Sequence, residues 1–336
     1  MLSTKNVKLN LRDGKVMTMN PHTDVICREV GLRDGLQIVD IFFPTDEKIR
    51  WMREEVAAGV GSIQACSFVP PNRLPQFKDA EQVARAAGEI EGLWVSVLVP
   101  NLRGAEIAAS IGADEIGFIT SVSESHNAAN VRRTSDELLN EFRKIVEFRN
   151  SLPTEKRFKL TSGLSTAFGC SIEGAIDPAS VMRLAEKYVS AGSEMLTVGD
   201  TVGYANPVQV KKLFGELIAE FGSDVDVLGH FHDTRGLGIA NAFAAYEAGC
   251  VMFDASLAGL GGCPYAPTAT GNIVMEDLVF MFESAGIRTG IDLEKLMPVR
   301  KIIEKNLPEE PLHGAFAEAG APKGFVFVTN KTEAAE

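Results

Sequence analysis

The chain has 336 residues, of which 45% are hydrophobic, and its formal net charge is −12. This acidic balance, without any run of Lys or Arg, argues against nucleic acid and anionic lipid as partners. No apolar stretch approaches the ~20 residues that a membrane-spanning helix needs. Five scattered cysteines without CxxC spacing favour a reducing compartment, and we expect a cytoplasmic protein; a transit peptide at the N-terminus is the less favoured interpretation.

Short apolar runs alternate with longer amphipathic segments along the chain. The amphipathic segments predict helices, for example at 46–58, 135–148 and 207–221, where Asn206 is a candidate N-cap. The apolar runs predict buried strands at 25–30, 62–68, 93–99, 115–119, 158–165, 195–199, 225–232 and 252–257.

Eight strands alternating with helices predict a single (β/α)8 TIM barrel of the α/β class. An open doubly wound sheet is the alternative, but no strand is followed by a Gly-rich dinucleotide or P-loop signature. We expect an N-terminal extension at 1–23, the barrel at 24–292, and a C-terminal helix and tail at 293–336. The active site of such a barrel lies at the C-terminal ends of its strands, so polar residues there are the candidates.

The seventh predicted strand ends with two histidines, His230 and His232. Side chains two residues apart on a strand point to the same side, so both imidazoles can face the barrel mouth and bind a divalent metal. The alternative is that one histidine is a hydrogen-bonded core residue. The pairing at this place favours the metal site.

The first predicted strand is followed by Arg33 and Asp34 in a turn flanked by glycines. Asp34 can supply a carboxylate to the same metal, and Arg33 can stabilise a developing oxyanion. A purely structural Arg–Asp turn pair explains these two residues equally well.

The eighth predicted strand leads into a Gly-rich segment that contains Cys263 and, nine residues later, Asn272. Gly259, Gly261 and Gly262 give this segment the freedom of a mobile loop. The Cys263 thiol could therefore exchange a proton with a substrate, although a spectator cysteine is the alternative. Asn272 can offer a carbonyl oxygen to the metal. Such mixed ligands suit Mg2+ or Mn2+ and leave Zn2+ as a less favoured choice.

Two further polar residues, Asp200 after the sixth strand and Gln64 in the second, also face the predicted mouth. Each could orient the substrate or a metal ligand. Each could equally cap a turn that follows its strand.

Six segments, in order, resemble motifs of the 3-hydroxy-3-methylglutaryl-CoA lyase family. They are EVGLRDGLQ, SFVPPNRLPQ, SESHNAANVRRT, GDTVGYANP, HFHDTRG and AGLGGCPYAPTATGN, the last followed by EDLVFM, and the resemblance runs from Val25 to Leu293. The GGCPYAP segment is the most specific, because it separates these lyases from the related isopropylmalate and homocitrate synthases.

This resemblance implies an acyl-CoA substrate, which is cleaved in the family to acetyl-CoA and acetoacetate. It implies that Arg33 stabilises the enolate of the departing acetyl-CoA, that Cys263 acts from a flexible loop, and that Asp200 matches a residue needed for activity. It also implies a divalent cation held by Asp34, His230, His232 and Asn272.

Several departures from the family pattern lie near the expected pocket. Leu32 replaces the usual Pro, Gln64 replaces a Glu of the second strand, and Arg235 stands where an aromatic or polar residue is usual. Gln64 cannot act as a base, whereas Arg235 is an extra cation that could bind a substrate carboxylate. A lyase acting on another 3-hydroxyacyl chain, such as citramalyl-CoA, therefore stays open, as do a condensing synthase and a non-catalytic acyl-CoA-binding barrel. By analogy with other barrels we expect a homodimer or a higher homo-oligomer.

Overall fold

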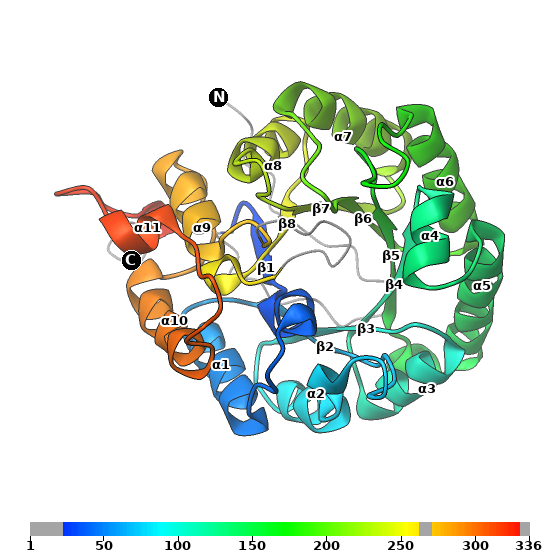
Figure 1. Ribbon diagram of the computed structural model, residues 1–336, viewed down its shortest axis with the longest axis horizontal. Coiled ribbons are helices and arrows are strands. Elements are labelled where there is room, and N and C mark those ends of the chain that lie inside the picture. The colour runs from blue at the N-terminus through cyan, green and yellow to red at the C-terminus, as the bar shows by residue number, and fades with distance from the viewer. Residues whose placement is uncertain (1–22, 262–270, 330–336) are drawn as a thin grey trace.

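The computed structural model describes residues 23–261 and 271–329 of the chain. Within these residues, eight parallel strands close into one barrel, and each strand pairs with the next along the chain. Figure 1 shows the barrel end-on, with the helices forming a ring outside the strands. The predicted (β/α)8 fold is confirmed. The strands are β1 (Ile26–Glu29), β2 (Ser62–Ser67), β3 (Trp94–Leu98), β4 (Glu115–Ser121), β5 (Lys159–Ser165), β6 (Met195–Asp200), β7 (Asp226–Phe231) and β8 (Met252–Ala255).

Helices follow the strands, and several begin where the sequence provides an N-cap. Asn206 and Gln209 form a reciprocal capping box at the start of α7, and Pro207 occupies its first position. Thr134 and Glu137 do the same for α5. The helices are α1 (Thr45–Ala57), α2 (Ala80–Gly88), α3 (Leu102–Ile111), α4 (Glu124–Asn130), α5 (Ser135–Ser151), α6 (Pro178–Ala191), α7 (Pro207–Phe221), α8 (Gly238–Glu247), α9 (Met275–Ser284), α10 (Leu293–Asn306) and α11 (Ala315–Ala319). The short helical turns are η1 (Gly31–Gly35), η2 (Leu36–Ile38), η3 (Pro75–Phe77), η4 (Thr154–Lys156) and η5 (Leu257–Gly259).

Five strands end one or two residues earlier than the apolar pattern predicts, and at β1, β7 and β8 the hydrogen bonds show the reason. Val30 lies outside β1 because its carbonyl accepts the N–H groups that open the turn η1. His232 follows β7 and forms a short bridge with Asn272. Leu257 follows β8 because its N–H donates to the carboxylate of Glu29. All three departures form turns at the barrel mouth, where the candidate site residues lie.

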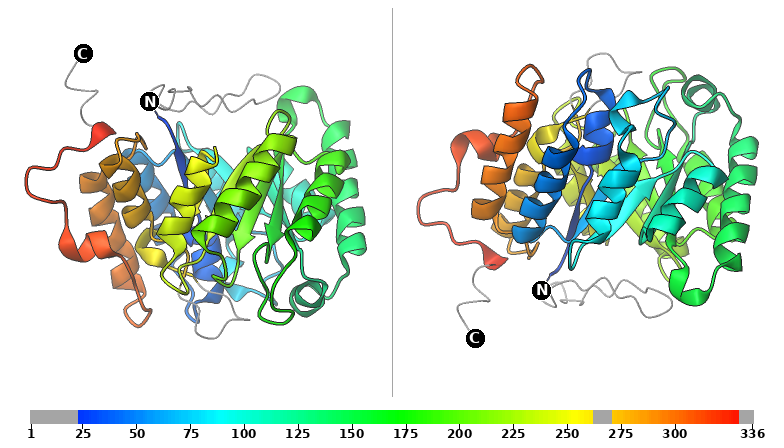
Figure 2. Two further views of the ribbon diagram at one scale, coloured as in Figure 1. Left: turned by 90° about the horizontal axis from the view of Figure 1, so that it is seen from above. Right: turned by 90° about the horizontal axis from the view of Figure 1, so that it is seen from below.

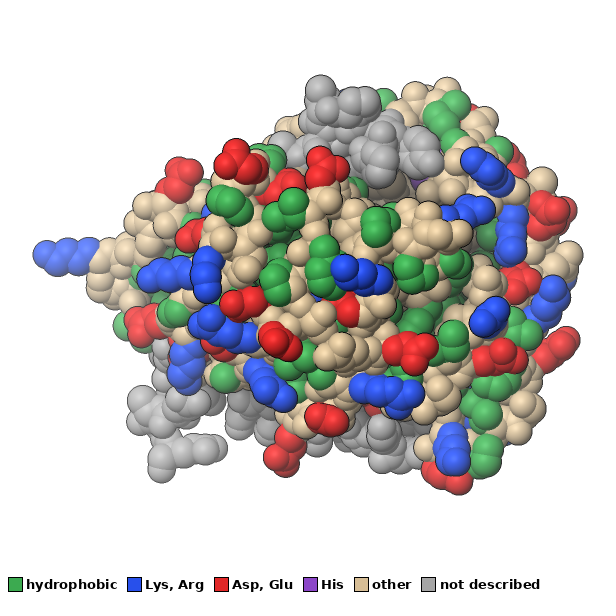
Figure 3. Space-filling view, turned by 60° about the horizontal axis from the view of Figure 1, so that its bottom comes forward, with side chains coloured by type: hydrophobic (Ala, Val, Ile, Leu, Met, Phe, Trp, Pro, Cys, Tyr) green, Lys and Arg blue, Asp and Glu red, His purple; other side chains and the backbone are tan. Residues whose placement is uncertain are grey.

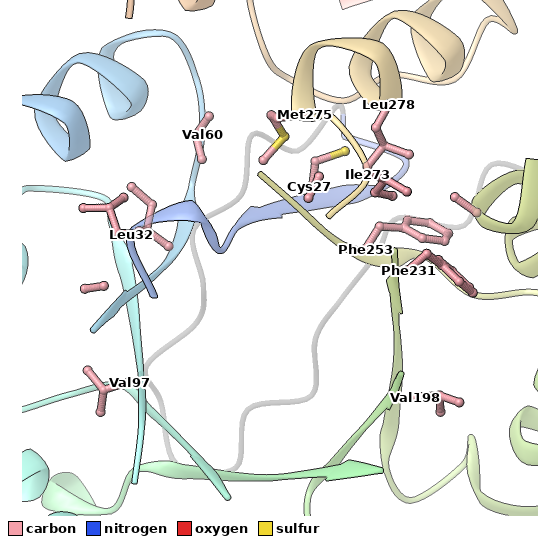
Figure 4. Close-up of a cluster of buried hydrophobic side chains, with 14 of the residues drawn as sticks. Cys27, Leu32, Val60, Val97, Val198, Phe231, Phe253, Ile273, Met275 and Leu278 are labelled. Carbon is pink, nitrogen blue, oxygen red and sulfur yellow. The ribbon is translucent and has the colours of Figure 1, made fainter. Parts of the chain in front are cut away.

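Hydrophobic side chains fill the layer between the strands and the helices. Figure 4 shows Val97, Val198, Phe231 and Phe253 projecting from their strands away from the barrel centre. Because side chains alternate along a strand, the residue next to each of these points into the barrel. Because the apolar side chains of β7 and β8 are buried on the outside of the barrel, the polar side chains next to them point into the barrel.

The C-terminal segment completes the helical ring and extends beyond it. The helix α10 packs against α1 and α9, and α11 packs on the outside of α9 (Figure 2). The ring of Phe280 on α9 lies 5.0 Å from the ring of Phe316 and 5.5 Å from that of Phe325, measured between centroids. Aromatic packing thus holds the last described residues against α9.

The surface is a mixture of charges. Figure 3 shows acidic and basic side chains interspersed over the face that it presents. Several of them form exposed ion pairs, such as Lys211 with Glu247, which joins α7 to α8. Among the described helices, none combines the length and the apolar character needed to cross a membrane.

A buried ion cluster lies inside the barrel. Arg28 on β1 donates to Asp254 on β8 at 2.6 and 3.0 Å and to Glu115 on β4 at 2.6 Å. Glu115 also accepts hydrogen bonds from the Trp94 indole and the Ser96 hydroxyl. One guanidinium therefore compensates two carboxylates that are almost fully shielded from water.

We predict that Arg28→Met destabilises the fold by about 3–5 kcal/mol, because it leaves two buried carboxylates without their cation. The measurement is the free energy of unfolding from urea titration of the variant and the native protein. Arg50→Met is the control, since Arg50 lies at the surface and its pairs with Glu47 and Glu54 are exposed. A loss below about 1 kcal/mol for Arg28→Met would show that the cluster contributes no more than a surface pair does.

Candidate active site

Three potential metal ligands converge at the C-terminal mouth of the barrel. Asp34 belongs to the turn after β1, His230 is in β7 and His232 follows that strand. Their ligand atoms all lie within 4.8 Å of one another. Oδ2 of Asp34 is 3.9 Å from Nε2 of His230 and 3.7 Å from Nε2 of His232, and the two nitrogens are 3.2 Å apart. One carboxylate and two imidazoles this close together form a possible site for a divalent metal.

Asn272 is the fourth ligand expected from the sequence, and it lies beside this cluster. Its amide nitrogen donates to Oδ2 of Asp34 at 2.9 Å and to the carbonyl of Leu260 at 3.2 Å. Its carbonyl oxygen is buried without a hydrogen-bond partner. A buried acceptor left open next to a carboxylate and two imidazoles fits a cation ligand, because such an oxygen otherwise costs about 1–3 kcal/mol.

The charges of the cluster favour the protonation states that a metal site needs. Burial opposes ionisation of Asp34, but the Arg33 guanidinium and the two imidazoles outweigh it and lower the pKa of this carboxyl. Burial, followed by the neighbouring His230, lowers the pKa of His232 to about 4. At neutral pH the site therefore presents a carboxylate and, at His232, a neutral imidazole, which are the ligand forms of both groups.

Sequence reasoning missed the group that orients His230. Nδ1 of His230 lies 2.9 Å from Oδ2 of Asp254 on the neighbouring strand. Burial works against the charge of Asp254, but Arg28 and His230 hold its pKa well below the usual range, so its carboxylate accepts and Nδ1–H donates. This bond leaves Nε2 of His230 available as a ligand. An acidic residue inside the apolar run of β8 was the signal that could have revealed it.

Arg33 is held in place by two neighbours. Its Nη1 donates to Oδ1 of Asp34 at 2.5 Å, and its Nε donates to Oε1 of Gln64 on β2. The Gln64 amide reaches the hydroxyl of Ser96 at 3.4 Å. Gln64 therefore holds the guanidinium of Arg33 beside the candidate metal ligands. Because the amide is a neutral acceptor, it leaves more of the positive charge of Arg33 uncompensated than a carboxylate would.

The turn that carries Arg33 and Asp34 is built on one carbonyl. The oxygen of Val30 accepts from the N–H groups of Arg33 at 3.0 Å and of Asp34 at 2.7 Å, which winds the chain tightly after β1. Gly31 has no room for a side chain, because a Cβ there would lie 2.6 Å from the carboxylate of Glu29 and from the hydroxyl of Ser256. Close packing thus sets the direction of both side chains.

Asp200 and Arg235 lie at the rim: Asp200 ends β6, the strand that pairs with β7, and Arg235 lies in the turn after β7. The buried carboxylate of Asp200 accepts from the N–H groups of Tyr204 at 2.7 Å and Ala205 at 3.1 Å, so it caps the turn after β6. Burial raises its pKa to about 6. Arg235 is exposed, donates to the carbonyl of Val202 at 2.9 Å, and stacks over the Tyr204 ring at 4.6 Å.

Cys263 and Gly262 lie outside the described residues, but the chain leading to them is described. Gly259 and Gly261 adopt positive φ angles of 63° and 131°, which residues with a side chain rarely adopt. A Cβ at Gly271, where the chain returns, would lie 1.9 Å from the carbonyl oxygen of Gly259. The two ends of the segment therefore pass in contact at the barrel mouth.

The HMGL-like family model matches residues 24–303. The chain belongs to the HMGL-like family. It is 39% identical to the hydroxymethylglutaryl-CoA lyase YngG of Bacillus subtilis, over 84% of this chain and 93% of that protein. It is 37% identical to the (R)-citramalyl-CoA lyase of Chloroflexus aurantiacus, over 87% and 93% of the two chains.

A solved structure supports the same assignment. An HMG-CoA lyase from Acinetobacter baumannii, in complex with coenzyme A and 3-methylmalate, superposes with a TM-score of 0.83 and 38% identity, over 90% of this chain and 97% of that one. This HMGL-like protein is accordingly an enzyme, a carbon–carbon lyase of the hydroxymethylglutaryl-CoA lyase type.

We predict that Asp254→Asn weakens Mn2+ binding roughly 10–100-fold, because the amide no longer fixes His230 in its ligand form. His232→Ala removes a ligand and should weaken binding further. Free Mn2+ is measured by electron paramagnetic resonance, below the unfolding temperature of each variant. Asp226→Asn is the control, since Asp226 lies at the opposite end of β7 and binds Lys159. Native affinity in both Asp254→Asn and His232→Ala would contradict the metal assignment.

Proposed function

We propose that this protein is a divalent-metal-dependent lyase that cleaves 3-hydroxy-3-methylglutaryl-CoA to acetyl-CoA and acetoacetate, with Mg2+ or Mn2+ as the cation. The observation that carries the proposal is the convergence of Asp34, His230 and His232 beside the guanidinium of Arg33. The coenzyme A bound to the lyase from A. baumannii supports the thioester substrate. The mixed oxygen and nitrogen ligands favour Mg2+ or Mn2+ over Zn2+.

The reaction is a retro-Claisen cleavage. The tertiary hydroxyl loses its proton, the bond between C2 and C3 breaks, and the acetyl-CoA fragment leaves as an enolate that must then be protonated. A divalent cation held by Asp34, His230, His232 and Asn272 would polarise the substrate oxygens and lower the cost of removing the hydroxyl proton. The protein must supply a base, a positive partner for the enolate, and an acid.

Arg33 is the positive partner. Its guanidinium is nearly buried and held by Asp34 and Gln64, so it needs no reorganisation when charge develops on the thioester oxygen. The candidates for the base that accepts the hydroxyl proton are Asp34, His230 and a water that a bound cation would hold; His230 can serve only while its Nε2 is not bound to the cation, because its Nδ1–H donates to Asp254. We assign the protonation of the enolate to Cys263, which follows the turn at Gly259 in the sequence.

The acyl chain can also be a relative of the 3-hydroxy-3-methylglutaryl group. The similarity to the (R)-citramalyl-CoA lyase supports a citramalyl thioester as the second candidate. Gln64 supports it too, because the neutral amide leaves positive charge of Arg33 free to attract a carboxylate placed closer to the reacting carbon. We assign the binding of a substrate anion to Arg235, whose exposed guanidinium lies over the turn that Asp200 caps.

We predict that the purified protein with Mn2+ or Mg2+ releases acetyl-CoA from 3-hydroxy-3-methylglutaryl-CoA, and that a chelator reduces the rate at least about 100-fold, because electrostatic stabilisation of this kind is worth several kcal/mol. The assay follows acetyl-CoA by chromatography over a panel of thioesters that includes citramalyl-CoA. Turnover of citramalyl-CoA alone would select the second candidate. Tight coenzyme A binding without turnover of any thioester would overturn the lyase proposal.

We predict that Arg235→Gln raises KM for the thioester roughly 5–10-fold and leaves kcat within about twofold, because Arg235 contributes uniform binding at the rim and not transition-state stabilisation. Steady-state kinetics in low salt measures both constants. Arg183→Gln, on the exposed face of α6, is the matched control and should change neither. An effect of Arg235→Gln confined to kcat would contradict this role.

A further inference from the structure

Two of the candidate metal ligands, Asp34 and Asn272, depend on turns that separate from each other at the barrel mouth. The last backbone hydrogen bond between the ends of β1 and β8 joins the N–H of Val30 to the carbonyl of Ala255 at 2.9 Å. Beyond it, η1 carries Asp34, and η5 leads to Leu260, which bonds to Asn272. Among the backbone hydrogen bonds of the described residues, none joins η1 to η5. Side chains must therefore set the distance between the two turns.

The carboxylate of Glu29 joins these turns. One of its oxygens accepts the N–H of Gly31, the first residue of η1. The other accepts the N–H of Leu257, the first residue of η5, at 2.9 Å. Glu29 ends β1 and is fully buried, so both bonds are made away from water, where a hydrogen bond to a charged group is strong and its loss is costly. One side chain thus bonds to the first N–H group of both turns.

The two turns pack closely against each other. A Cβ at Gly35, the last residue of η1, would lie 3.1 Å from the side chain of Leu260 and 3.2 Å from its carbonyl oxygen. A Cβ at Gly261 would lie 3.5 Å from Cα of Gly35 and 2.6 Å from the amide nitrogen of Asn272. Because the contact has no spare room, a change in the distance between η1 and η5 would displace Asn272 as well.

The side chain of Asn272 connects the spacing of the turns to the metal site. Its amide nitrogen donates both to Oδ2 of Asp34 in η1, at 2.9 Å, and to the carbonyl of Leu260 after η5, at 3.2 Å. Because the amide group is planar, these two bonds fix the direction of its carbonyl oxygen, which is buried without a hydrogen-bond partner. That oxygen is the candidate ligand, so the distance between η1 and η5 sets its orientation.

We propose that Glu29 is a positioning residue: by accepting one N–H from each turn, its carboxylate holds Asp34 and Asn272 at the separation at which both can bind one cation. The catalytic consequence of this role rests on the proposed lyase function, whereas its effect on metal affinity is independent of the substrate. Among the hydrogen bonds of the described residues, Glu29 makes none to a candidate ligand, and it acts through the main chain of η1 and η5.

A second buried glutamate provides a matched control at the other end of the barrel. Glu283 on α9 is 2% exposed and accepts the N–H groups of Thr289 and Thr329, both at 2.8 Å. These segments lie beside the start of β1, opposite the mouth, because the carbonyl of Arg288 accepts the N–H of Asp24. Glu283 therefore joins two backbone segments by the same chemistry, and its loss disturbs the fold away from the candidate metal site.

Two substitutions test the charge and the reach of this carboxylate separately. Glu29→Gln keeps the length of the side chain but replaces one acceptor oxygen by an amide donor, whereas Glu29→Asp keeps the charge and shortens the reach by one methylene. We expect each to weaken Mn2+ binding roughly 5–20-fold and to lower kcat by a similar factor, somewhat less than the roughly 10–100-fold effect of a group that contacts a metal ligand directly. Glu283→Gln should leave both quantities within about twofold of the native values.

Electron paramagnetic resonance measures Mn2+ affinity without thioester, on variants whose circular dichroism shows them to be folded, and kcat is measured at saturating Mn2+. The spectrum of bound Mn2+ should also change in both Glu29 variants, because it reports the arrangement of the ligands. A purely structural role would lower the free energy of unfolding, as in Glu283→Gln, and leave the affinity and the spectrum of the folded protein unchanged.

The proposal is overturned if either Glu29 variant binds Mn2+ with native affinity, or if Glu283→Gln loses as much affinity as they do. Should one Glu29 variant fail to fold, the other decides; failure of both to fold would leave Glu29 a structural role only and refute the proposal. A native protein that binds Mn2+ but turns over no thioester would refute the lyase function and leave the affinity comparison valid. A native protein that binds no Mn2+ would overturn both.

Discussion

An ionised carboxylate at 5% exposure would cost several kcal/mol if it stood alone, and Asp34 is in that position. The protein compensates it with the guanidinium of Arg33, two imidazoles and the amide of Asn272. Arg33 shares the turn after β1 with Asp34, the imidazoles lie at the end of β7, and Asn272 lies in the segment after β8. The demand for polar partners around Asp34 therefore ties the ends of β1, β7 and β8 into one site, in which the carboxylate, the two imidazoles and the open carbonyl oxygen of Asn272 form a candidate cation site.

The polar organisation continues into the barrel. Asp254 fixes one nitrogen of His230, Arg28 compensates Asp254, and Glu115 shares that guanidinium. The interior thus contains a connected series of charged side chains, each held by the next. Such a series makes stability and function depend on the same residues, since a change at Arg28 acts on folding directly and on His230 through Asp254.

Two residues that depart from the family pattern, Gln64 and Arg235, change the charge around the site and leave the candidate metal ligands in place. Gln64 holds Arg33 without adding a negative charge, and Arg235 adds a cation above the turn that Asp200 caps. Behind the turns, the buried carboxylate of Glu29 accepts the N–H groups of Gly31 and Leu257. The candidate metal ligands and the surrounding residues therefore have separate tasks in the proposed reaction: the former would hold the cation, and the latter set the charge and the alignment around it.

The sequence by itself determined the barrel, because short apolar runs that alternate with amphipathic segments report which stretches are buried strands and which are helices, and it determined that His230 and His232 share a face. Only the tertiary structure decided that Asp254 orients His230, that Gln64 accepts a hydrogen bond from Arg33, and that Asp200 caps a turn. The bond between Arg28 and Asp254 joins residues 226 positions apart, and that between Asn272 and Asp34 joins residues 238 apart. Closing the barrel brings its first and last strands together, and no local pattern encodes which polar groups meet there.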